Sequence, residues 1–248
     1  GDADQLPSVG PGHFLHDLLV SDRPAVVELN RVHRRSEGST ITDNAHRIRQ
    51  GLEPEFPEGQ EIGEFHFIEA GSDERTLEIV VDLVSRRIPA KFGLAPMSDI
   101  QVLAPMYRGA AGVDALNSAL QGALNPGPDQ LAGPRHAFRR GDRIICLRND
   151  YDREVFNGEI GHVAAVDQEA SILRASFEGR IVEYTALELD RLAPAYAITV
   201  HRAQGTEVPC VVLPVLTSQA IMLQRNLLYT AVTRARTLVV LVGSSQAL

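Results

Sequence analysis

Residues 195–215 read AYAITVHRAQGTEVPCVVLPV, and residues 223–243 read LQRNLLYTAVTRARTLVVLVG. Each block joins an apolar run, typical of a buried strand, to polar residues that a hydrophobic core would exclude. These polar residues are Thr199, His201, Gln204, Glu207, Arg234 and Arg236. Because a sequence usually breaks its hydrophobic pattern in this way for a ligand, the two blocks predict a functional site.

The composition is that of an ordinary globular protein. The chain has 248 residues, 44% hydrophobic and 23% charged, which is enough for one large or two modest domains. No apolar run approaches the roughly 20 residues of a membrane span, and residues 1–10 do not resemble a secretory signal. Cys146 and Cys210 both lie in apolar runs, so we expect buried free thiols in a reducing cytosol.

The charge is unevenly distributed. A net charge of −8 argues against a histone-like nucleic-acid binder, but it leaves room for a local basic groove. One basic cluster occupies residues 31–49. The second comprises Arg135, His136, Arg139, Arg140 and Arg143, and for it a solvated surface and a nucleic-acid role are equally open.

Lys91 is the only lysine, so 23 of the 24 basic residues are arginine. A Walker A loop requires a lysine after glycine to reach the β- and γ-phosphates of a nucleotide. Lys91 stands instead in PAKFG. We therefore expect that this chain cannot by itself bind a nucleotide in the P-loop manner.

Periodicity predicts an α/β fold with a parallel sheet. Helices are expected at 13–20, 40–50, 77–86, 113–124 and around 222–235, and strands at 26–29, 64–70, 100–104, 195–200, 210–215 and 238–243. Residues 139–192 have a different character, with short strands and the turns Asn157-Gly158 and Glu178-Gly179. This stretch predicts a small β-barrel of SH3 size, inserted into the α/β domain.

Six segments in order carry a family resemblance: residues 1–12, 29–51, 100–126, 141–161, 196–207 and 229–236. Together they resemble the C-terminal half of superfamily 1 DNA helicases, most closely the RecD-like (exodeoxyribonuclease V alpha) branch. The resemblance implies a RecA-like parallel sheet flanked by helices. It assigns residues 1–22 to the tail of a first motor domain, 23–138 and 192–248 to a second motor domain, and 139–191 to an inserted SH3-like β-barrel.

The resemblance also implies a nucleotide site shared with the missing first domain. Arg34 and Arg234 match the family's arginine fingers, which stabilise charge on the γ-phosphate, and Gln5 matches its phosphate sensor. Arg35 stands where relatives usually have glutamine, so either Arg34 or Arg35 meets the phosphate. Arg236 is expected on the far side of the same helix as Arg234, in a surface salt bridge.

The remaining site residues have two sources. Gly205 and Glu207 match the segment that meets the nucleotide ribose, and Thr199, His201 and Arg202 match the motif that touches the nucleic-acid backbone. Further expected nucleic-acid contacts are Arg108 and Gly109, which follow a strand end where an α/β sheet presents its ligands, and Asn117 on the polar side of its helix, where an ordinary surface position is the alternative. Their hydroxyl, imidazole, guanidinium and amide groups donate to phosphates, and aromatic residues are few, so contact with the strand backbone independent of sequence is expected.

The predicted function is the C-terminal motor portion of an ATP-dependent 5′→3′ DNA helicase in the bacterial cytoplasm, associated with the nucleoid. ATP and Mg²⁺ are expected in the full-length enzyme, with neither cofactor nor metal on this portion, which should lack ATPase activity alone. Expected partners are single-stranded DNA, the missing N-terminal RecA-like domain and RecBC-type subunits, with no membrane. The alternatives are a non-catalytic DNA- or protein-binding module on a RecA-like platform, and the helicase part of a conjugative relaxase.

Overall fold

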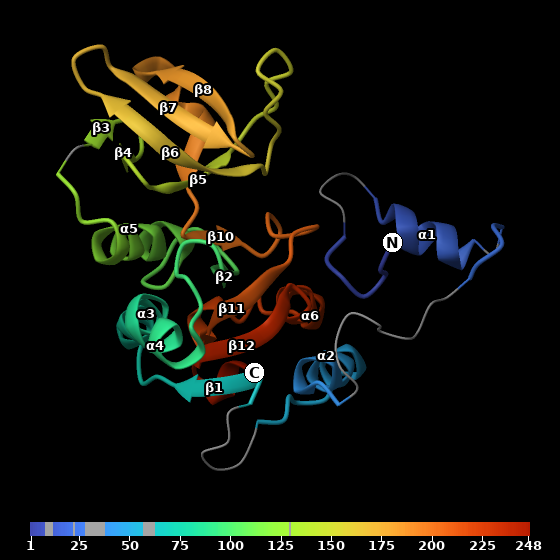
Figure 1. Ribbon diagram of the computed structural model, residues 1–248. Helices are drawn as coiled ribbons and strands as arrows, with labels where there is room; N and C mark the ends of the chain where they lie inside the picture. Colours follow the sequence, from blue (N-terminus) through green and yellow to red (C-terminus); the bar gives the residue numbers. More distant parts are fainter. Residues whose placement is uncertain (8–11, 22, 28–37, 57–62, 129) are drawn as a thin grey trace.

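The main sheet of the molecule has five parallel strands in the order β1-β12-β11-β2-β10 (Figure 1). The computed structural model describes residues 1–7, 12–21, 23–27, 38–56, 63–128 and 130–248. The strands are β1 (Phe65–Glu69), β2 (Ile100–Ala104), β10 (Ala197–Thr199), β11 (Val208–Val215) and β12 (Ala235–Gly243). Runs such as VVLPV and LVVLV suit strands that are buried on both faces, and the predicted parallel sheet is confirmed.

Helices cover both faces of this sheet. One face packs against α2 (Thr40–Gln50) and α6 (Arg225–Val232). The other packs against α3 (Asp73–Asp82), a π-helical turn (Leu83–Arg87), α4 (Ile88–Phe92) and α5 (Val113–Leu124). The short helix α1 (Phe14–Val20) has no buried residue and lies to one side (Figure 1).

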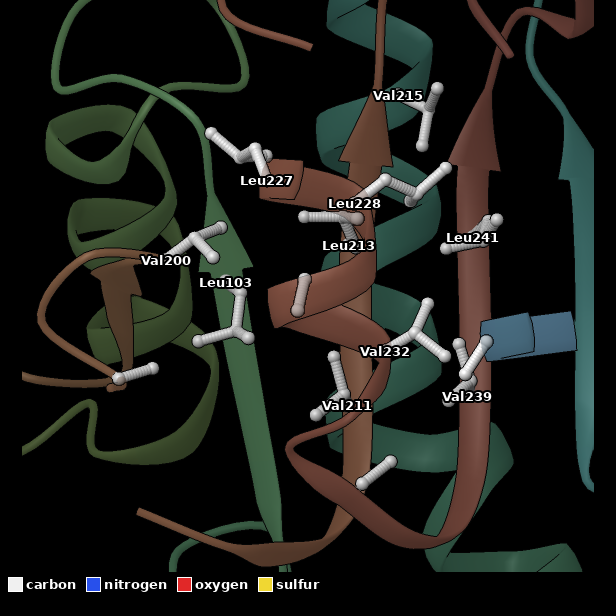
Figure 2. Packing of buried hydrophobic residues seen from close by; sticks show 14 of the residues in the cluster. Leu103, Val200, Val211, Leu213, Val215, Leu227, Leu228, Val232, Val239 and Leu241 are labelled. Atoms are coloured by element: carbon white, nitrogen blue, oxygen red, sulfur yellow. The ribbon is translucent and has the colours of Figure 1, made fainter. Parts of the chain in front are cut away.

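The core between α6 and the sheet is entirely aliphatic in the view of Figure 2. Leu227, Leu228 and Val232 of α6 face Leu213 of β11 and Leu241 of β12. Burying each such side chain contributes about 1.5–3 kcal/mol relative to exposure. This packing holds α6 against β11 and β12, and therefore positions the polar residues that follow the helix.

A second, antiparallel sheet lies above α5 and β10 (Figure 1). Its strands, in the order β8-β7-β6-β5-β9, are β5 (Arg143–Cys146), β6 (Ile160–Asp167), β7 (Ile172–Phe177), β8 (Arg180–Thr185) and β9 (Leu192–Pro194). A hairpin of β3 (Gln130–Ala132) and β4 (Ala137–Arg139) and the 3₁₀ helix Ala186–Arg191 complete this unit. It has its own core, which includes Phe138, Phe177 and Tyr184.

The predicted turn at Glu178-Gly179 joins β7 to β8, and both residues have positive φ, 46° and 86°. Among the described residues the edge strands β8 and β9 do not pair with each other, so the sheet stays open where a closed barrel was expected. Short 3₁₀ helices also occur at Thr217–Gln219 and Ser245–Ala247.

A buried carboxylate joins the two units. Asp142 is fully buried and accepts four hydrogen bonds: from Gln121 Nε2 (2.6 Å), Asn125 Nδ2 (2.7 Å), the Arg139 backbone N (2.7 Å) and the Tyr196 hydroxyl (2.7 Å). Burial, together with Asp142, raises the pKa of Tyr196. The network ties α5 of the parallel domain to the β3–β4 hairpin of the second unit.

Two local expectations were wrong. Val26 and Val27 are exposed coil, although a strand was predicted at 26–29, and residues 28–29 lie outside the described part. The last helix ends at Val232, so Arg234 follows it and Arg236 lies in β12, where a helix to 235 was predicted. Within the described ranges, no helix combines the length and apolar character needed to cross a bilayer.

Candidate functional site

Two loops leave the same edge of the parallel sheet side by side. β2 and β10 pair in parallel with Thr199 opposite Ala104, so the loops at 105–112 and 200–207 begin next to each other. Ligands of open α/β sheets bind beyond the carboxyl ends of such strands. The predicted nucleic-acid residues lie largely in these two loops.

The two loops touch through a cation–π contact. The guanidinium carbon of Arg202 lies 5.8 Å from the ring centroid of Tyr107. The hydroxyl of Thr199 accepts a hydrogen bond from the backbone N of Arg202 at 3.3 Å, which fixes the start of the second loop. The predicted residues Thr199 and Arg202 are therefore neighbours of an aromatic ring that the sequence analysis did not single out.

These residues line an open cleft of about 1000 Å³. The predicted residues Thr199, His201 and Arg202 all face it. The walls also include Pro7 of the N-terminal segment and the Asn157-Gly158 turn of the second unit. The cleft thus lies where the N-terminal segment, the parallel domain and the inserted sheet meet.

The other predicted contacts flank this cleft. Arg108 is exposed and lines a neighbouring groove, while Gly109 has a φ of 105°, a left-handed conformation that favours glycine. Asn117 is buried, and its amide donates to the backbone O and accepts from the backbone N of Ala197, both at 2.9 Å. Asn117 thereby hydrogen-bonds to the backbone of the edge strand β10. A direct role of Asn117 in binding a nucleic-acid strand stays a prediction.

The predicted residues Gln5 and Arg234 meet in space. Arg234 is 5% exposed, and its Nη2 donates to Gln5 Oε1 at 3.1 Å. Its Nε donates to the Thr230 carbonyl and its Nη1 to the Thr206 carbonyl, each at 3.2 Å. The guanidinium therefore links α6, the loop before β11 and the N-terminal segment.

The N-terminal segment has two further hydrogen bonds to this region. The backbone N of Leu6 donates to Thr230 Oγ1 at 2.8 Å, and the Leu6 carbonyl accepts from Gln204 Nε2 at 2.7 Å. Gln204 also lines the cleft. The residues around Arg234 and the cleft are thus connected through residues 5–7.

The loop before β11 holds the predicted ribose-contacting residues. Gly205 has a φ of 83°, which explains why glycine stands there. Glu207 follows two residues later, and its carbonyl accepts from Arg236 Nη2 at 3.3 Å. Arg236 therefore lies beside this loop on β12, whereas the sequence analysis expected it on the far side of the same helix as Arg234.

Arg34 and Arg35 lie outside the described residues. Whether Arg34 and Arg234 converge on one phosphate, and which of the two adjacent arginines does so, therefore stays a prediction. The same holds for the roles assigned to Gly205 and Glu207.

Part of the second basic cluster lies beside the cleft. Arg135, His136 and Arg139 line the groove that Arg108 also faces. Burial lowers the pKa of His136; the nearby Asp114 opposes this shift and Arg135 adds to it. The imidazole is therefore mainly neutral at pH 7, and the permanent charge of this wall comes from its arginines.

Sequence reasoning missed Tyr107 and Asp142. Tyr107 was one position from a predicted contact, and its place in PMYRG after a strand was the available signal. Asp142 stands in an ordinary glycine-aspartate turn, and its side-chain partners come from two distant segments, α5 and Tyr196, so the sequence offered no comparable signal.

Three family models match the chain. Residues 194–242 match the UvrD-like helicase C-terminal domain, and residues 116–177 match the ATP-dependent RecD-like DNA helicase SH3 domain. Residues 1–70 match an AAA domain. The first two matches include the cleft residues from Leu147 onward and leave out Pro7, Pro105, Met106 and Tyr107.

Curated relatives match along nearly the whole chain. The ATP-dependent RecD2 DNA helicase of Deinococcus radiodurans is 36% identical over 250 residues, covering 100% of this chain and 32% of that protein. The RecBCD enzyme subunit RecD of Mycolicibacterium smegmatis is 32% identical, covering 98% of this chain and 44% of that protein. The chain therefore spans less than half the length of these relatives.

Solved structures share the fold. A Pif1 helicase from Bacteroides, in complex with ADP-AlF3 and single-stranded DNA, aligns with a TM-score of 0.56 at 20% identity, covering 97% of this chain and 60% of that one. A second Pif1 structure, at forked double-stranded DNA, gives a TM-score of 0.54. The predicted RecA-like fold class is thereby confirmed.

Proposed function

Because this chain corresponds to the C-terminal part of RecD-like superfamily 1 helicases, we propose that it is the second motor domain of an ATP-dependent DNA helicase. In the full-length protein it supplies arginines to a nucleotide held mainly by the first motor domain. It also supplies part of the surface that grips single-stranded DNA. The translocation polarity we propose is 5′→3′.

The observation that carries this proposal is the connection between two groups of residues. Arg234 binds Gln5 and the carbonyl of Thr206, and Thr206 lines the same cleft as Thr199, His201 and Arg202. A motor needs such a connection, because hydrolysis at one site has to change the grip at the other. A passive binding module has no need of it.

On the nucleotide side, Arg234 is the proposed arginine finger. A guanidinium is always charged and pairs bidentately with phosphate oxygens, and its neighbour Gln5 can both donate and accept hydrogen bonds. This donor set fits a phosphate, and Glu207 would hold the ribose. Bound ATP with Mg²⁺ supplies the phosphoryl group whose transfer to water drives the motor.

Arg34 or Arg35 is proposed as a second positive group at the same phosphate. In the described ranges no cluster of three histidine, cysteine or acidic side chains could hold a metal ion. We assign the residues that hold Mg²⁺ to the rest of the full-length protein, because this sequence contains no Walker A loop.

On the nucleic-acid side, the cleft offers donors to the phosphate backbone. Thr199, His201 and Arg202 supply a hydroxyl, an imidazole and a guanidinium, and Arg108 adds a charge beside them. Backbone contacts carry no base information, so binding should be largely independent of sequence. RecBC-type subunits are further proposed partners, because relatives named RecD are subunits of the RecBCD enzyme.

The proposal is tested with the full-length protein on two tailed duplexes. With ATP and Mg²⁺ it should separate a duplex with a 5′ single-stranded tail and leave one with a 3′ tail paired. His201→Ala with Arg202→Ala should reduce unwinding and strand binding together. Strand binding without any ATP-dependent unwinding would instead indicate a non-catalytic binding module.

A further inference from the structure

The strand β8 forms one edge of the antiparallel sheet in the second unit. Among the described strands it pairs only with β7, and it lies at the opposite end of the sheet from β9, which leads back into the parallel domain. Figure 1 shows β8 at the top of the molecule, away from the parallel sheet. No residue of β8 lines the cleft or the neighbouring groove, so the proposed function leaves this edge without a role.

The register of β7 and β8 shows which backbone groups of β8 are unpaired. In an antiparallel pair, residues that exchange hydrogen bonds alternate with residues whose N–H and C=O groups point away from the partner strand. Just beyond β8, the backbone N of Ala186 donates to the Ser171 carbonyl at 3.1 Å, so the bonded positions of β8 are the even-numbered ones. The backbone groups of Ile181 and Glu183 therefore point outward, and they bond no other residue in the described part of the chain.

Two apolar side chains are exposed on this strand and directly after it. Ile181 is 56% exposed, and Leu187, in the 3₁₀ helix that follows β8, is 90% exposed. The strand has no proline, lysine or bulge, the features that usually protect a free edge from pairing. An edge of this kind can accept another extended chain, whose backbone supplies the hydrogen bonds and whose alternate side chains supply specificity.

The part of the second unit around β8 is acidic. Residues 150–190 contain ten acidic residues and three basic ones, all arginine. Each of these arginines already forms an ion pair: Arg153 with Glu188 at 2.8 Å, Arg174 with Glu183 at 2.7 Å, and Arg180 with Glu159. The surplus of negative charge repels nucleic-acid phosphates and attracts a basic chain.

We propose that β8 binds an extended basic segment of a partner protein, which adds to the sheet as a further strand. The outward N–H and C=O groups of Ile181 and Glu183 bond the backbone of this segment, and its basic side chains face the surplus carboxylates. A second copy of this chain fits poorly, because pairing two β8 strands brings two acidic surfaces together. This inference does not depend on the proposed function, since β8 lines neither of the two depressions assigned or adjacent to the strand site.

The test uses the full-length protein and a fluorescent peptide of about eight alternating valine and arginine residues, long enough to span β8. The peptide should bind, and amide hydrogen exchange should slow within residues 180–185. The same peptide methylated at its backbone nitrogens keeps its side chains and charges but cannot donate, so it should bind at least about tenfold more weakly. A peptide with glutamate in place of arginine should not bind.

Glu183→Pro tests the edge from the side of the protein. It removes an outward N–H without removing a bond to β7, and proline is tolerated at such positions of edge strands. It should weaken peptide binding about tenfold. Glu183→Gln is the matched control, because it removes the same charge and keeps the N–H, and it should weaken binding less. Urea unfolding checks that both variants are folded, and the methylated peptide decides the question on the wild-type protein if the proline variant is not.

Three results would overturn the inference. Equal binding of the parent and methylated peptides would show that charge alone attracts the peptide and that no strand is added. Failure of the parent peptide to bind would mean that another part of the full-length protein covers β8. A dimer that Glu183→Pro converts to a monomer would assign the edge to a second copy of the chain.

Discussion

The side chains of Gln5 and Arg234, 229 positions apart in the chain, meet through a 3.1 Å hydrogen bond from Nη2 to Oε1. The same guanidinium binds the Thr206 carbonyl, and Leu6 next to Gln5 binds Gln204. Gln204 and Thr206 both line the cleft. One short network therefore joins the proposed nucleotide-facing arginine to the proposed strand site.

Arg234→Ala in the full-length protein should abolish most strand-stimulated ATP hydrolysis. An arginine finger contributes about 10³–10⁵ in turnover, because it stabilises charge that develops in the transition state. We expect kcat to fall by about 10³ with little change in the affinity for ATP, measured by steady-state kinetics and nucleotide titration.

The control for this experiment is Arg236→Ala. Arg236 lies on β12, is exposed, and donates only to the Glu207 carbonyl among the contacts described for its side chain. Its removal should leave kcat within a few-fold of the wild-type value. A loss at Arg234 confined to nucleotide affinity would contradict the finger role, because a ground-state contact would then explain it.

Gln204→Ala should uncouple hydrolysis from strand binding. The substitution removes the 2.7 Å bond to the Leu6 carbonyl and leaves Gln5 and Arg234 in place. One hydrogen bond of this kind contributes about 0.5–1.5 kcal/mol, so stimulation of ATPase activity by single-stranded DNA should fall by up to about tenfold. The ATPase rate without DNA should stay the same. An equal fall with and without DNA would show that Gln204 acts only in folding.

Periodicity alone predicted most of the fold, because buried parallel strands and one-sided helices leave strong local patterns. The predicted helix at 113–124 coincides with α5. The pattern failed at the end of α6, where apolar spacing continues into β12 and hides the break after Val232. The sequence therefore placed Arg236 on the wrong kind of element.

The candidate site was predictable only through family motifs. The sequence gives no local reason for Gln5 to meet Arg234, or for Tyr107 to meet Arg202, because both pairs form through tertiary contacts. The hydrogen-bond network at Asp142 could not be predicted for the same reason. Its donors are residues of ordinary types, such as glutamine and tyrosine, which occur on any protein surface. Hydrophobic pattern fixes which face is buried, whereas polar networks depend on the final positions of several elements.

Asp142→Asn should destabilise the joint between the two units. The carboxylate accepts bonds from four donors, and an asparagine NH₂ in its place would face donors such as Gln121 and Tyr196. Losing a buried charged acceptor costs about 1.5–3 kcal/mol per bond, so we expect a loss of about 3 kcal/mol in the free energy of unfolding. Urea unfolding measures it.

Tyr196→Phe is the smaller perturbation at the same joint. It removes one of the four donors and keeps the buried ring, so it should cost about 1.5 kcal/mol, the lower end of the range for one bond to a charged acceptor. A loss as large as that of Asp142→Asn would mean that the packing of the ring, and not the carboxylate, holds the units together.

Cys210 should make the protein less stable in alkali. The residue is fully buried in β11, and burial raises the pKa of its thiol to about 12. An unfolded thiol loses its proton near pH 8.5, so above about that pH the unfolded state binds fewer protons than the native state. Stability linked to this thiol is therefore complete below about pH 8.5 and falls as pH rises toward 12.

The measurement compares wild type with Cys210→Ala in urea at about pH 8 and about pH 10, on either side of the ordinary thiol pKa. At the lower pH the alanine variant should be less stable, because it leaves a small cavity. At the higher pH this difference should shrink, since only the wild type has a thiol to titrate. Arg143 and Tyr184, whose pKa values are also shifted by burial, are present in both proteins and largely cancel in the difference. A difference that stays constant with pH would show that the thiol titrates alike in both states, and that Cys210 is not sealed within β11.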